Sequence, residues 1–406
     1  MFRVKRPALA LILPLALGIL TQQHSSAVQA PTAPVTIPFD LATRHIMVKV
    51  RVNNSRPLSF ILDTGAHMAI VRSQTAAELG LSLYGSVNSG GAGAGSMAGQ
   101  RVKDARWTLV GLEGFSQPVT LALPFPVLPA GLGQDVDGII GGEFIREFVA
   151  EFNYQARAMT LHDRKTFEYR GKGHTLPLEF NSDNHPVVRA TVTPVGGKPI
   201  EDRFVLDLGS GGALILHSPF VDTHGLLGPQ SKTIRAIGMG GAGGRSVGRL
   251  GRVSALQIGP FTINEPITTF SQDQGGAFAN RSLGGNIGAQ IASRFRTILD
   301  YGRRRIILEP SATFGEPFDR ASSGMAVRAE GADYRTFRVR EVLEDSPATE
   351  AGVREGDVIA SIDGVPAEKF TLTLLLETLQ KPSAQQLTIR RGEETIKLVL
   401  TPRRML

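Results

Sequence analysis

The chain has no cysteine among its 406 residues. This absence excludes disulfide bonds and metal sites built from thiolates. Aromatic residues make up only 6% of the chain, and a single one is tryptophan. Hydrophobic residues still reach 42%, which is enough for sizeable cores, and the length predicts two or three domains. The fold must therefore be held together by its hydrophobic cores alone.

Long hydrophobic runs are confined to the N-terminus. A basic start, MFRVKR, is followed by an apolar run over residues 7–20 and a polar stretch with small residues at Val28 and Ala30. This layout is typical of a secretory signal peptide, and the apolar run is shorter than the roughly 20 residues of a membrane span. We expect a signal peptide over residues 1–30, cleavage after Ala30 and a periplasmic or secreted protein. An uncleaved anchor is the alternative.

The chain lacks a long run of basic residues. Lys and Arg number 44 against 37 Asp and Glu, which gives a net charge of +7. Without such a run, nucleic acid is not expected as a partner, and the small basic cluster at 303–305 is expected to be a solvated strand end. The eight histidines are scattered and form no H-E-x-x-H motif, so we expect no metal and no cofactor. The G-x-S-x-G at 244–248 needs a later histidine to act as a serine nucleophile, and the last histidine is His224.

An internal duplication is the most informative feature of the sequence. The stretch FILDTGAHMAIV (60–71) is repeated as FVLDLGSGGALIL (204–216), and Asp207 takes the place of Asp63. Each Asp-X-Gly lies in an apolar run, where a lone ionised carboxylate would be costly to bury. A turn Asp that caps backbone amides is one interpretation of each motif. The other interpretation is a pair of similar lobes that bring the two carboxylates together.

The duplication extends well beyond the Asp-X-Gly motifs. Residues 137–154 align with 285–301, and each half carries a glycine-rich stretch, at 89–102 and 238–253. Short alternating segments with Gly, Pro and Asn between them predict β-strands throughout. A repeat in fixed order predicts two β-lobes related by a pseudo-two-fold axis, with Asp63 and Asp207 meeting at the axis. Carboxylates so close share one proton, so one can act as general base on water and the other as general acid.

These motifs resemble the aspartic proteases of the pepsin and retropepsin type. The resemblance covers roughly residues 35–312 and implies a mainly β acid-protease fold of two lobes and an aspartic-type endopeptidase. It implies Asp63 and Asp207 as the catalytic pair. It also implies supporting roles for the residues of the two turns and of the apolar-Gly elements behind them: Thr64, Gly65, Gly209, Ser210, Ile140, Gly141, Ile287 and Gly288. Glycines of the two rich stretches correspond to flaps that close over substrate: Gly91, Gly93, Gly95, Gly241 and Gly243.

The sequence departs from the family pattern at several positions. Leu208 stands where members carry Thr or Ser, whose hydroxyl bonds across the lobes; a remaining buried partner left unsatisfied would cost about 1–3 kcal/mol. His67 replaces a small or hydroxyl residue, and Asn286 replaces an apolar one. Neither flap has the tyrosine of pepsin flaps. These departures keep open a second hypothesis, a weak or inactive peptide-binding protein that retains the cleft.

The C-terminal residues resemble a bacterial PDZ domain. The resemblance rests on SPATEAGV (346–353), GDVI (356–359) and IDG (362–364). PDZ domains bind peptide C-termini beside an edge strand and a helix, or serve as an intramolecular brace. We expect the edge strand at 338–342. The peptide groove is expected at Tyr334, Arg335, Thr336, Phe337 and Val339.

The expected organisation is thus a series of separate units. The N-terminal lobe spans 31–168, the C-terminal lobe 169–313, a linker 314–324 and the PDZ domain 325–406. The linker is polar and short, which predicts few contacts across it. We expect a monomer whose partners are peptide or protein substrates and C-terminal peptide ligands.

Overall fold

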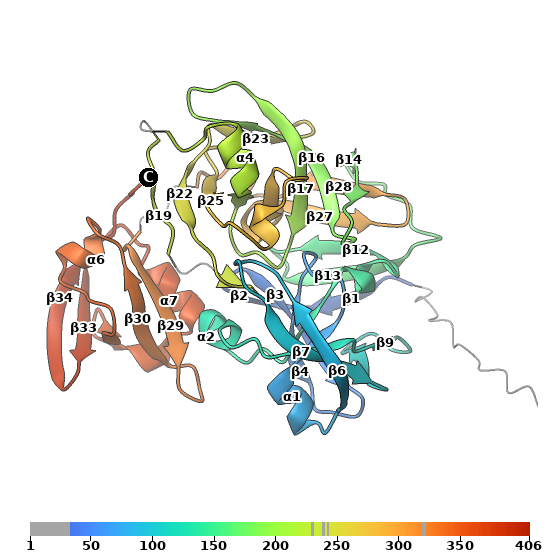
Figure 1. The fold of residues 1–406 in the computed structure, drawn as a ribbon, viewed down its shortest axis with the longest axis horizontal. Helices are drawn as coiled ribbons and strands as arrows, with labels where there is room; N and C mark the ends of the chain where they lie inside the picture. Colours follow the sequence, from blue (N-terminus) through green and yellow to red (C-terminus); the bar gives the residue numbers. More distant parts are fainter. Residues whose placement is uncertain (1–32, 229–230, 238–239, 242, 319–321) are drawn as a thin grey trace, which may run out of the picture.

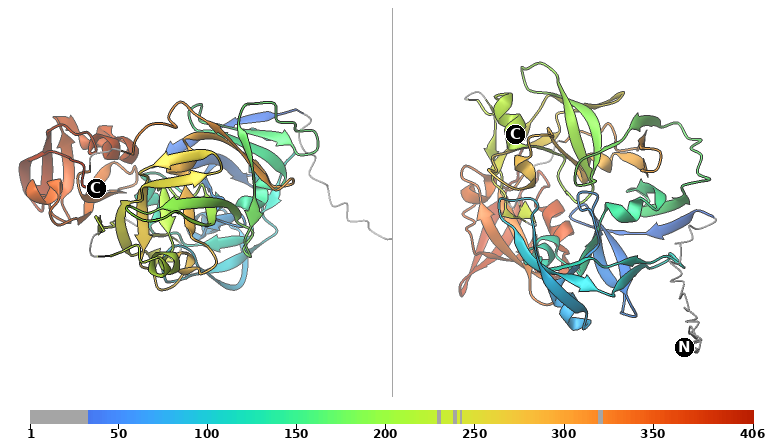
Figure 2. Two further views of the ribbon diagram at one scale, coloured as in Figure 1. Left: turned by 90° about the horizontal axis from the view of Figure 1, so that it is seen from above. Right: turned by 45° about the vertical axis from the view of Figure 1, so that its right-hand side comes forward.

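The computed structural model describes residues 33–228, 231–237, 240–241, 243–318 and 322–406. The expected signal peptide lies outside these residues. Two β-rich lobes pack against each other, and a smaller C-terminal domain, orange to red in Figures 1 and 2, lies at one side. Of the helices in the described ranges, none is long and apolar enough to cross a membrane. The expected fold class, mainly β with a C-terminal α+β domain, is confirmed.

The N-terminal lobe is built on one large sheet with the strand order β6-β7-β10-β5-β11-β4-β3-β8-β9. Its strands are β2 (Asp40–Ala42), β3 (His45–Val52), β4 (Leu58–Leu62), β5 (Ile70–Arg72), β6 (Ser82–Ser89), β7 (Met97–Lys103), β8 (Arg106–Leu109), β9 (Gln117–Pro118), β10 (Leu121–Leu123) and β11 (Gly138–Ile140). Strand β2 lies outside this order and pairs with β3. Its helices are α1 (Ser73–Glu78), α2 (Leu128–Leu132) and α3 (Gly142–Ile145).

The C-terminal lobe repeats this order as β19-β22-β25-β18-β26-β17-β16-β23-β24. Its strands are β15 (Glu179–Phe180), β16 (Pro186–Thr193), β17 (Ile200–Asp207), β18 (Leu214–Leu216), β19 (Ile234–Arg235), β22 (Gly248–Arg252), β23 (Ala255–Ile258), β24 (Phe261–Asn264), β25 (Ile267–Ser271) and β26 (Gly285–Gly288). Strand β15 lies outside this order and pairs with β16. The small hairpin β20 (Gly240–Gly241) and β21 (Gly244–Arg245), the helices α4 (Ser218–Thr223) and α5 (Ala289–Ala292), and the 3₁₀ helix η1 (Ala277–Ala279) complete it. The matching order means that the duplicated sequence folds as a duplicated structure.

A six-stranded sheet joins the lobes, in the order β1-β13-β12-β27-β28-β14. Its strands are β1 (Val35–Pro38), β12 (Phe148–Asn153), β13 (Ala158–Asp163), β14 (His174–Pro177), β27 (Phe295–Asp300) and β28 (Arg305–Pro310). The lobes meet where β12 pairs with β27, with Glu151 opposite Ile298. Buried apolar side chains of both lobes form one continuous core, so the two halves are a single folded unit.

The C-terminal domain has its own sheet, in the order β29-β30-β31-β33-β34, and its own apolar core. Its elements are β29 (Met325–Glu330), β30 (Thr336–Val342), α6 (Pro347–Glu350), β31 (Val358–Ile362), β32 (Val365–Pro366), η2 (Ala367–Lys369), α7 (Leu372–Thr378), β33 (Gln385–Arg391) and β34 (Glu394–Leu400). Ser346 caps α6 by accepting a hydrogen bond from the Thr349 amide. Gly352, with a φ of 84°, follows the helix.

The expected linker belongs in part to the C-terminal lobe. Phe314 packs against the lobe core, and the Arg294 guanidinium lies 3.7 Å from the ring centroid of the buried Phe318. Arg294 also donates a hydrogen bond of 3.1 Å to the Phe314 carbonyl. The chain therefore leaves the lobe after Phe318, and the prediction of a linker beginning at 314 is wrong.

Candidate active site

Asp63 and Asp207 come together where the two lobes meet. Asp63 follows β4 and Asp207 ends β17, and their carboxyl groups are close enough to share a hydrogen bond. A Cβ at Gly65 would lie 2.8 Å from Asp207 Oδ1, and one at Gly209 would lie 2.1 Å from the Asp63 carboxyl carbon. Each turn thus needs glycine because the carboxyl of the other lobe lies against its backbone.

The electrostatics of the pair favour one shared proton. Burial raises the pKa of Asp63 well above its usual range, and the negative charge of Asp207 raises it further. The Gly65 amide, which donates a hydrogen bond of 2.7 Å to Asp63 Oδ1, opposes this shift. The arrangement therefore suits a protonated Asp63 beside an ionised partner.

The apolar-Gly elements brace both turns from behind. The Asp63 amide donates to the Ile140 carbonyl at 2.9 Å, and a Cβ at Gly141 would lie 2.5 Å from the Met68 nitrogen. In the other lobe Ile287 is fully buried, and a Cβ at Gly288 would lie 2.4 Å from the Gly212 carbonyl oxygen. One further backbone hydrogen bond of 2.8 Å supports each turn. The Gly142 amide donates to the Ala66 carbonyl, and the Ala289 amide donates to the Ser210 carbonyl.

The cross-lobe bonding differs from the expectation. The Thr64 hydroxyl donates to the Leu206 carbonyl at 2.6 Å and accepts from the Leu208 amide at 2.9 Å. Both partners are backbone groups, so Thr64 is satisfied although Leu208 carries no hydroxyl. The Leu208 side chain is fully buried in the shared core. The cost expected for a partner left unsatisfied therefore does not arise, because the backbone of the other lobe supplies both partners of Thr64.

Asn286 connects the site to a buried histidine. Its Nδ2 donates to Asp207 Oδ2 at 2.8 Å, and its Oδ1 lies 2.9 Å from His217 Nε2. Burial lowers the pKa of His217, so its ring is neutral, and Nε2–H is the donor that Asn286 Oδ1 requires. In the sequence, Asn286 stands out only as a departure from the family pattern, and nothing points to His217. No local motif links two residues 69 positions apart.

Other titratable groups also face Asp207. His45 and His185 both feel its charge, and burial lowers the pKa of each, so these rings are neutral. Burial likewise raises the pKa of the Tyr154 hydroxyl far above its usual range. Asp207 thus faces an acid, two neutral histidines and a neutral phenol, and no cation pairs with it among these groups.

The two glycine-rich stretches, one from each lobe, contact each other directly. The Gly95 amide donates to the Gly243 carbonyl at 2.8 Å, and the Gly243 amide donates to the Ala92 carbonyl at 2.7 Å. The Gly91 carbonyl accepts from the Ala277 amide at 2.9 Å. A Cβ at Gly93 would lie 2.6 Å from the Gly243 oxygen, and one at Gly241 would lie 2.9 Å from Ala92 Cβ. All five predicted flap glycines therefore lie at this crossing, which only small residues permit.

An apolar cluster, here called the cleft cluster, lies beside Asp63 in the N-terminal lobe. It joins the strands around the Asp63 turn to the flap and to α2, and its buried members are Ala42, Met47, Ile61, Ile70, Leu123, Phe125, Leu132, Val136 and Ile139. Partly buried side chains packed against it include Met68 of the turn, Val87 and Met97 of the flap, and Leu128 of α2. The partly buried members keep some exposed apolar area near Asp63, which suits apolar side chains of an extended peptide.

The structure corrects the expected PDZ groove. The strand that contains 338–342, β30, pairs with β29 on one side and β31 on the other, so it cannot accept a peptide strand. Phe337 and Val339 are buried in the domain core. Tyr334 and Arg335 lie in the turn before β30, and Thr336 begins that strand. The sheet ends in β29 on one side and β34 on the other, and α7 contacts β29, so a groove for a peptide lies between β29 and α7.

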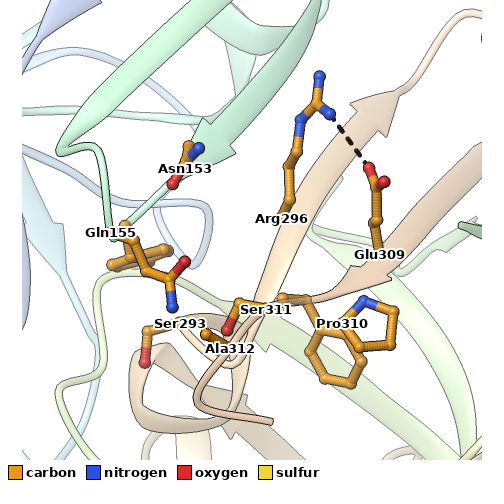
Figure 3. A pocket seen from close by; sticks show the side chains of 10 residues that line it. Asn153, Gln155, Ser293, Arg296, Glu309, Pro310, Ser311 and Ala312 are labelled. Atoms are coloured by element: carbon orange, nitrogen blue, oxygen red, sulfur yellow. Dashed lines mark hydrogen bonds and ion pairs between the residues drawn. The ribbon is translucent and has the colours of Figure 1, made fainter. Parts of the chain in front are cut away.

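A separate pocket of about 250 Å³ lies beside the joining sheet. It is lined by residues that follow β12 and by both ends of the β27–β28 hairpin (Figure 3). Its charged residues, Arg296 and Glu309, pair with each other at 3.1 Å, and Arg296 also donates to Glu151 at 2.6 Å. Neither catalytic candidate lines this pocket, and the charges it holds are already neutralised. In the described ranges, no group of three or more His, Asp or Glu side chains could hold a metal.

Comparison with known proteins finds similarity in two segments of the chain. Residues 48–144 match the family described as aspartyl protease, and residues 338–390 match the PDZ domain family. A curated relative, Serine protease HTRA1 of Xenopus laevis, is 43% identical over 63 residues, which are 16% of this chain and 13% of that protein. The chain thus matches only a small part of that relative's length.

Two solved structures are also similar. An aspartic proteinase from Irpex lacteus is 14% identical, with a TM-score of 0.41, and the match covers 71% of this chain and 100% of that one. The HtrA3 PDZ domain bound to a phage-derived ligand is 24% identical, with a TM-score of 0.19, and the match covers 21% and 86%. The chain thus contains a segment that matches the aspartyl protease family and, C-terminal to it, a segment that matches the PDZ domain family.

Proposed function

We propose that this protein is an exported aspartic endopeptidase in which Asp63 and Asp207 activate a water molecule. The observation that carries the proposal is the meeting of two carboxyl groups from duplicated turns, with the two flaps in contact. Their environments differ, which is the pattern that separates an acid from a base. Asp207 accepts a hydrogen bond from the side-chain amide of Asn286, whereas burial raises the pKa of Asp63.

These differences assign the roles. Asp207, as the carboxylate, takes a proton from water while the water oxygen attacks the peptide carbonyl carbon. Asp63 gives its proton to the carbonyl oxygen, so a neutral tetrahedral diol forms. The diol then collapses: the proton held by Asp207 goes to the leaving nitrogen, the C–N bond breaks, and one hydroxyl proton returns to Asp63. The step needs no metal and no covalent intermediate.

The site also suggests a substrate class. The partly buried side chains of the cleft cluster, such as Met68 and Met97, offer apolar surface between the Asp63 turn and the flap. Extended peptides with apolar side chains beside the scissile bond fit such a surface. The flaps touch each other, so we infer that they part to admit substrate.

The test is digestion of a mixed peptide library by the mature chain at several acidic and neutral pH values, with EDTA present. We expect cuts inside the peptides, next to apolar residues, and none with Asp63→Asn. Trimming from the peptide ends would contradict an endopeptidase. Binding without any cleavage would favour the second candidate, a peptide-binding protein that retains the cleft.

Export is part of the proposal. It is supported by the three-part N-terminus of residues 1–30. N-terminal sequencing of the protein recovered from the periplasm or medium should show a chain that begins at residue 31. A chain that keeps residues 1–30 in the cytoplasm would contradict it.

A further inference from the structure

The free edge of the PDZ sheet faces the protease lobe. Strand β29 has no strand partner on its outer side, and the described elements that approach it there are α7 and, from the N-terminal lobe, α2. Figure 1 shows α2 between the PDZ domain and the lobes. The place where a PDZ domain would receive a peptide strand is therefore next to a helix of the same chain.

Three contacts hold the N-terminal lobe against this edge of the PDZ domain, and two of them lie just after α2. Gly133, which ends α2 with a φ of 68°, lies so close to α7 that a Cβ there would be 2.4 Å from Leu372 Cβ. The Tyr334 hydroxyl donates to Asp135 Oδ1 at 3.0 Å. The Thr43 amide donates to the Thr373 hydroxyl of α7 at 3.0 Å. The first two contacts lie at the C-terminal end of α2, and the third joins the turn between β2 and β3 to α7.

The opposite side of α2 belongs to the cleft. Leu132 is buried in the cleft cluster, and Leu128 packs against it together with Val87 and Met97 of the flap. A displacement of α2 would therefore disturb the wall of the cleft as well as the groove.

A second contact ties the PDZ domain to the other flap. Glu341 of β30 is only 7% exposed and accepts hydrogen bonds from Arg235 and Arg245 of the C-terminal lobe, the latter at 2.7 Å. Arg245 lies in the flap hairpin β20–β21. The PDZ domain thus contacts both lobes.

We infer that α2 is an intramolecular occupant of the PDZ groove, and that a peptide C-terminus which pairs with β29 must displace it. The partner is a peptide with a free carboxylate and apolar side chains, because Met325, Val327 and Leu376 along the groove elements are apolar. Its apparent affinity is lowered by the fraction of molecules in which α2 has left the groove. This competition does not depend on peptide hydrolysis, so its test stands apart from that of the proposed function.

The test compares variants that loosen α2 with a matched control. In Gly133→Ala the new Cβ collides with Leu372, whereas in Gly131→Ala the new Cβ meets no atom within 4 Å. The probe is a fluorescent pool of hexapeptides ending in Val, Ile, Leu or Phe, and the same pool amidated at its C-terminus is the control. Binding is measured by anisotropy on the full mature chain with Asp63→Asn as background, so that no probe is consumed.

We expect Gly133→Ala to bind the free-carboxylate pool at least about tenfold more tightly than the parent, and Gly131→Ala to bind like the parent. In the parent chain, the peptide should speed amide hydrogen exchange over residues 124–135. Tyr334→Phe, which removes only the hydrogen bond to Asp135, should tighten binding about two- to threefold. It replaces Gly133→Ala as the test variant if Gly133→Ala fails to fold. Equal affinity in all folded variants, no binding by any of them, or binding without faster exchange at 124–135 would overturn the inference.

Discussion

At the scale of single residues, the site depends on how closely two carboxyl groups approach the opposite backbone. Gly65 and Gly209 leave the space, and Asp63 and Asp207 fill it from the other lobe. The lobes are otherwise similar here, so the differences between them decide which carboxyl keeps the proton. Asn286 is such a difference, because Ile139 occupies the matching position of the N-terminal lobe.

Replacing Asn286 by Ile should slow catalysis. The ionised Asp207 would lose a hydrogen bond to a charged group, which is worth about 1.5–3 kcal/mol, so kcat/KM should fall about 10- to 100-fold. The acidic limb of the pH–rate profile should move to higher pH, because the charged form loses a stabilising donor. Ile139→Leu at the matching position is the control. A pH profile that does not move in Asn286→Ile would show that Asn286 does not position the base.

Replacing Asp63 by Asn should make stability less dependent on pH. Because the folded-state pKa of Asp63 is raised, the native state holds a proton that the unfolded state has lost once the pH exceeds about 4. The free energy of unfolding of the wild type therefore falls as pH rises from about 4 toward the raised pKa. Asn is neutral at every pH, so the variant should be more stable at pH 7 by about 1 kcal/mol or more. Denaturant titrations at pH 4 and 7 measure this, and parallel pH dependence in both proteins would contradict it.

The role of Leu208 can be tested by Leu208→Thr. Because Thr64 bonds to backbone groups, the substitution should leave activity unchanged. It removes apolar contacts of a fully buried side chain, so the free energy of unfolding should fall by about 1–3 kcal/mol. Loss of activity in a folded variant would mean that the leucine side chain itself supports the site.

The pairing of Asp63 with Asp207 could be predicted because duplication places equivalent residues at a shared axis. The network of Asn286 and His217 could not, because it depends on how β18 and β26 lie side by side. The hydrogen bonds of Thr64 could not be predicted either. The sequence does not show that the Leu208 backbone amide replaces the hydroxyl group that family members usually supply. Side-chain motifs are visible in a sequence, whereas backbone partners are not.

At the scale of elements, the flap crossing is the most constrained contact. Gly93 has a φ of 92° and lies against Gly243, so Gly93→Ala should keep the flaps apart. We expect kcat/KM to fall about tenfold, mainly through KM, because flap closure contributes to substrate binding. Gly90→Ala meets no atom within 4 Å and is the matched control. Equal kinetics of the two variants would show that the crossing has no part in turnover.

The elements of the PDZ domain were predictable, but not their neighbours. The motifs at 346–353 and 356–364, on which the PDZ resemblance rests, lie on α6 and β31. The edge strand was misplaced because alternation shows which face of a strand is buried and not which strand ends the sheet. The sequence also gave no sign of α2 at the groove, since that contact joins segments of separate domains.

At the scale of the whole molecule, the PDZ domain is attached to both lobes. The prediction of few contacts across the linker is wrong, because Tyr334 and Glu341 of the domain bond to the lobes. Recruitment of large substrates therefore explains this arrangement less well than bracing does.

Removing the domain tests bracing. A chain that ends at Phe318 keeps both Asp-X-Gly turns and the buried phenylalanine, but it exposes α2 and leaves Arg245 without Glu341. We expect its melting temperature to fall by several degrees, which corresponds to about 1–2 kcal/mol. Cleavage of short peptides and of large substrates should fall by the same factor. Loss confined to large substrates would instead support recruitment through the groove.

The most direct measurement is the cleavage rate of one library-derived peptide by the wild type, Asp63→Asn and Asp207→Asn, across acidic and neutral pH. If the two carboxyl groups form one catalytic pair, each substitution alone should lower kcat/KM by about 10²- to 10⁴-fold at every pH, with folding intact. A folded Asp63→Asn or Asp207→Asn protein that cleaves the peptide at the wild-type rate would contradict the shared dyad.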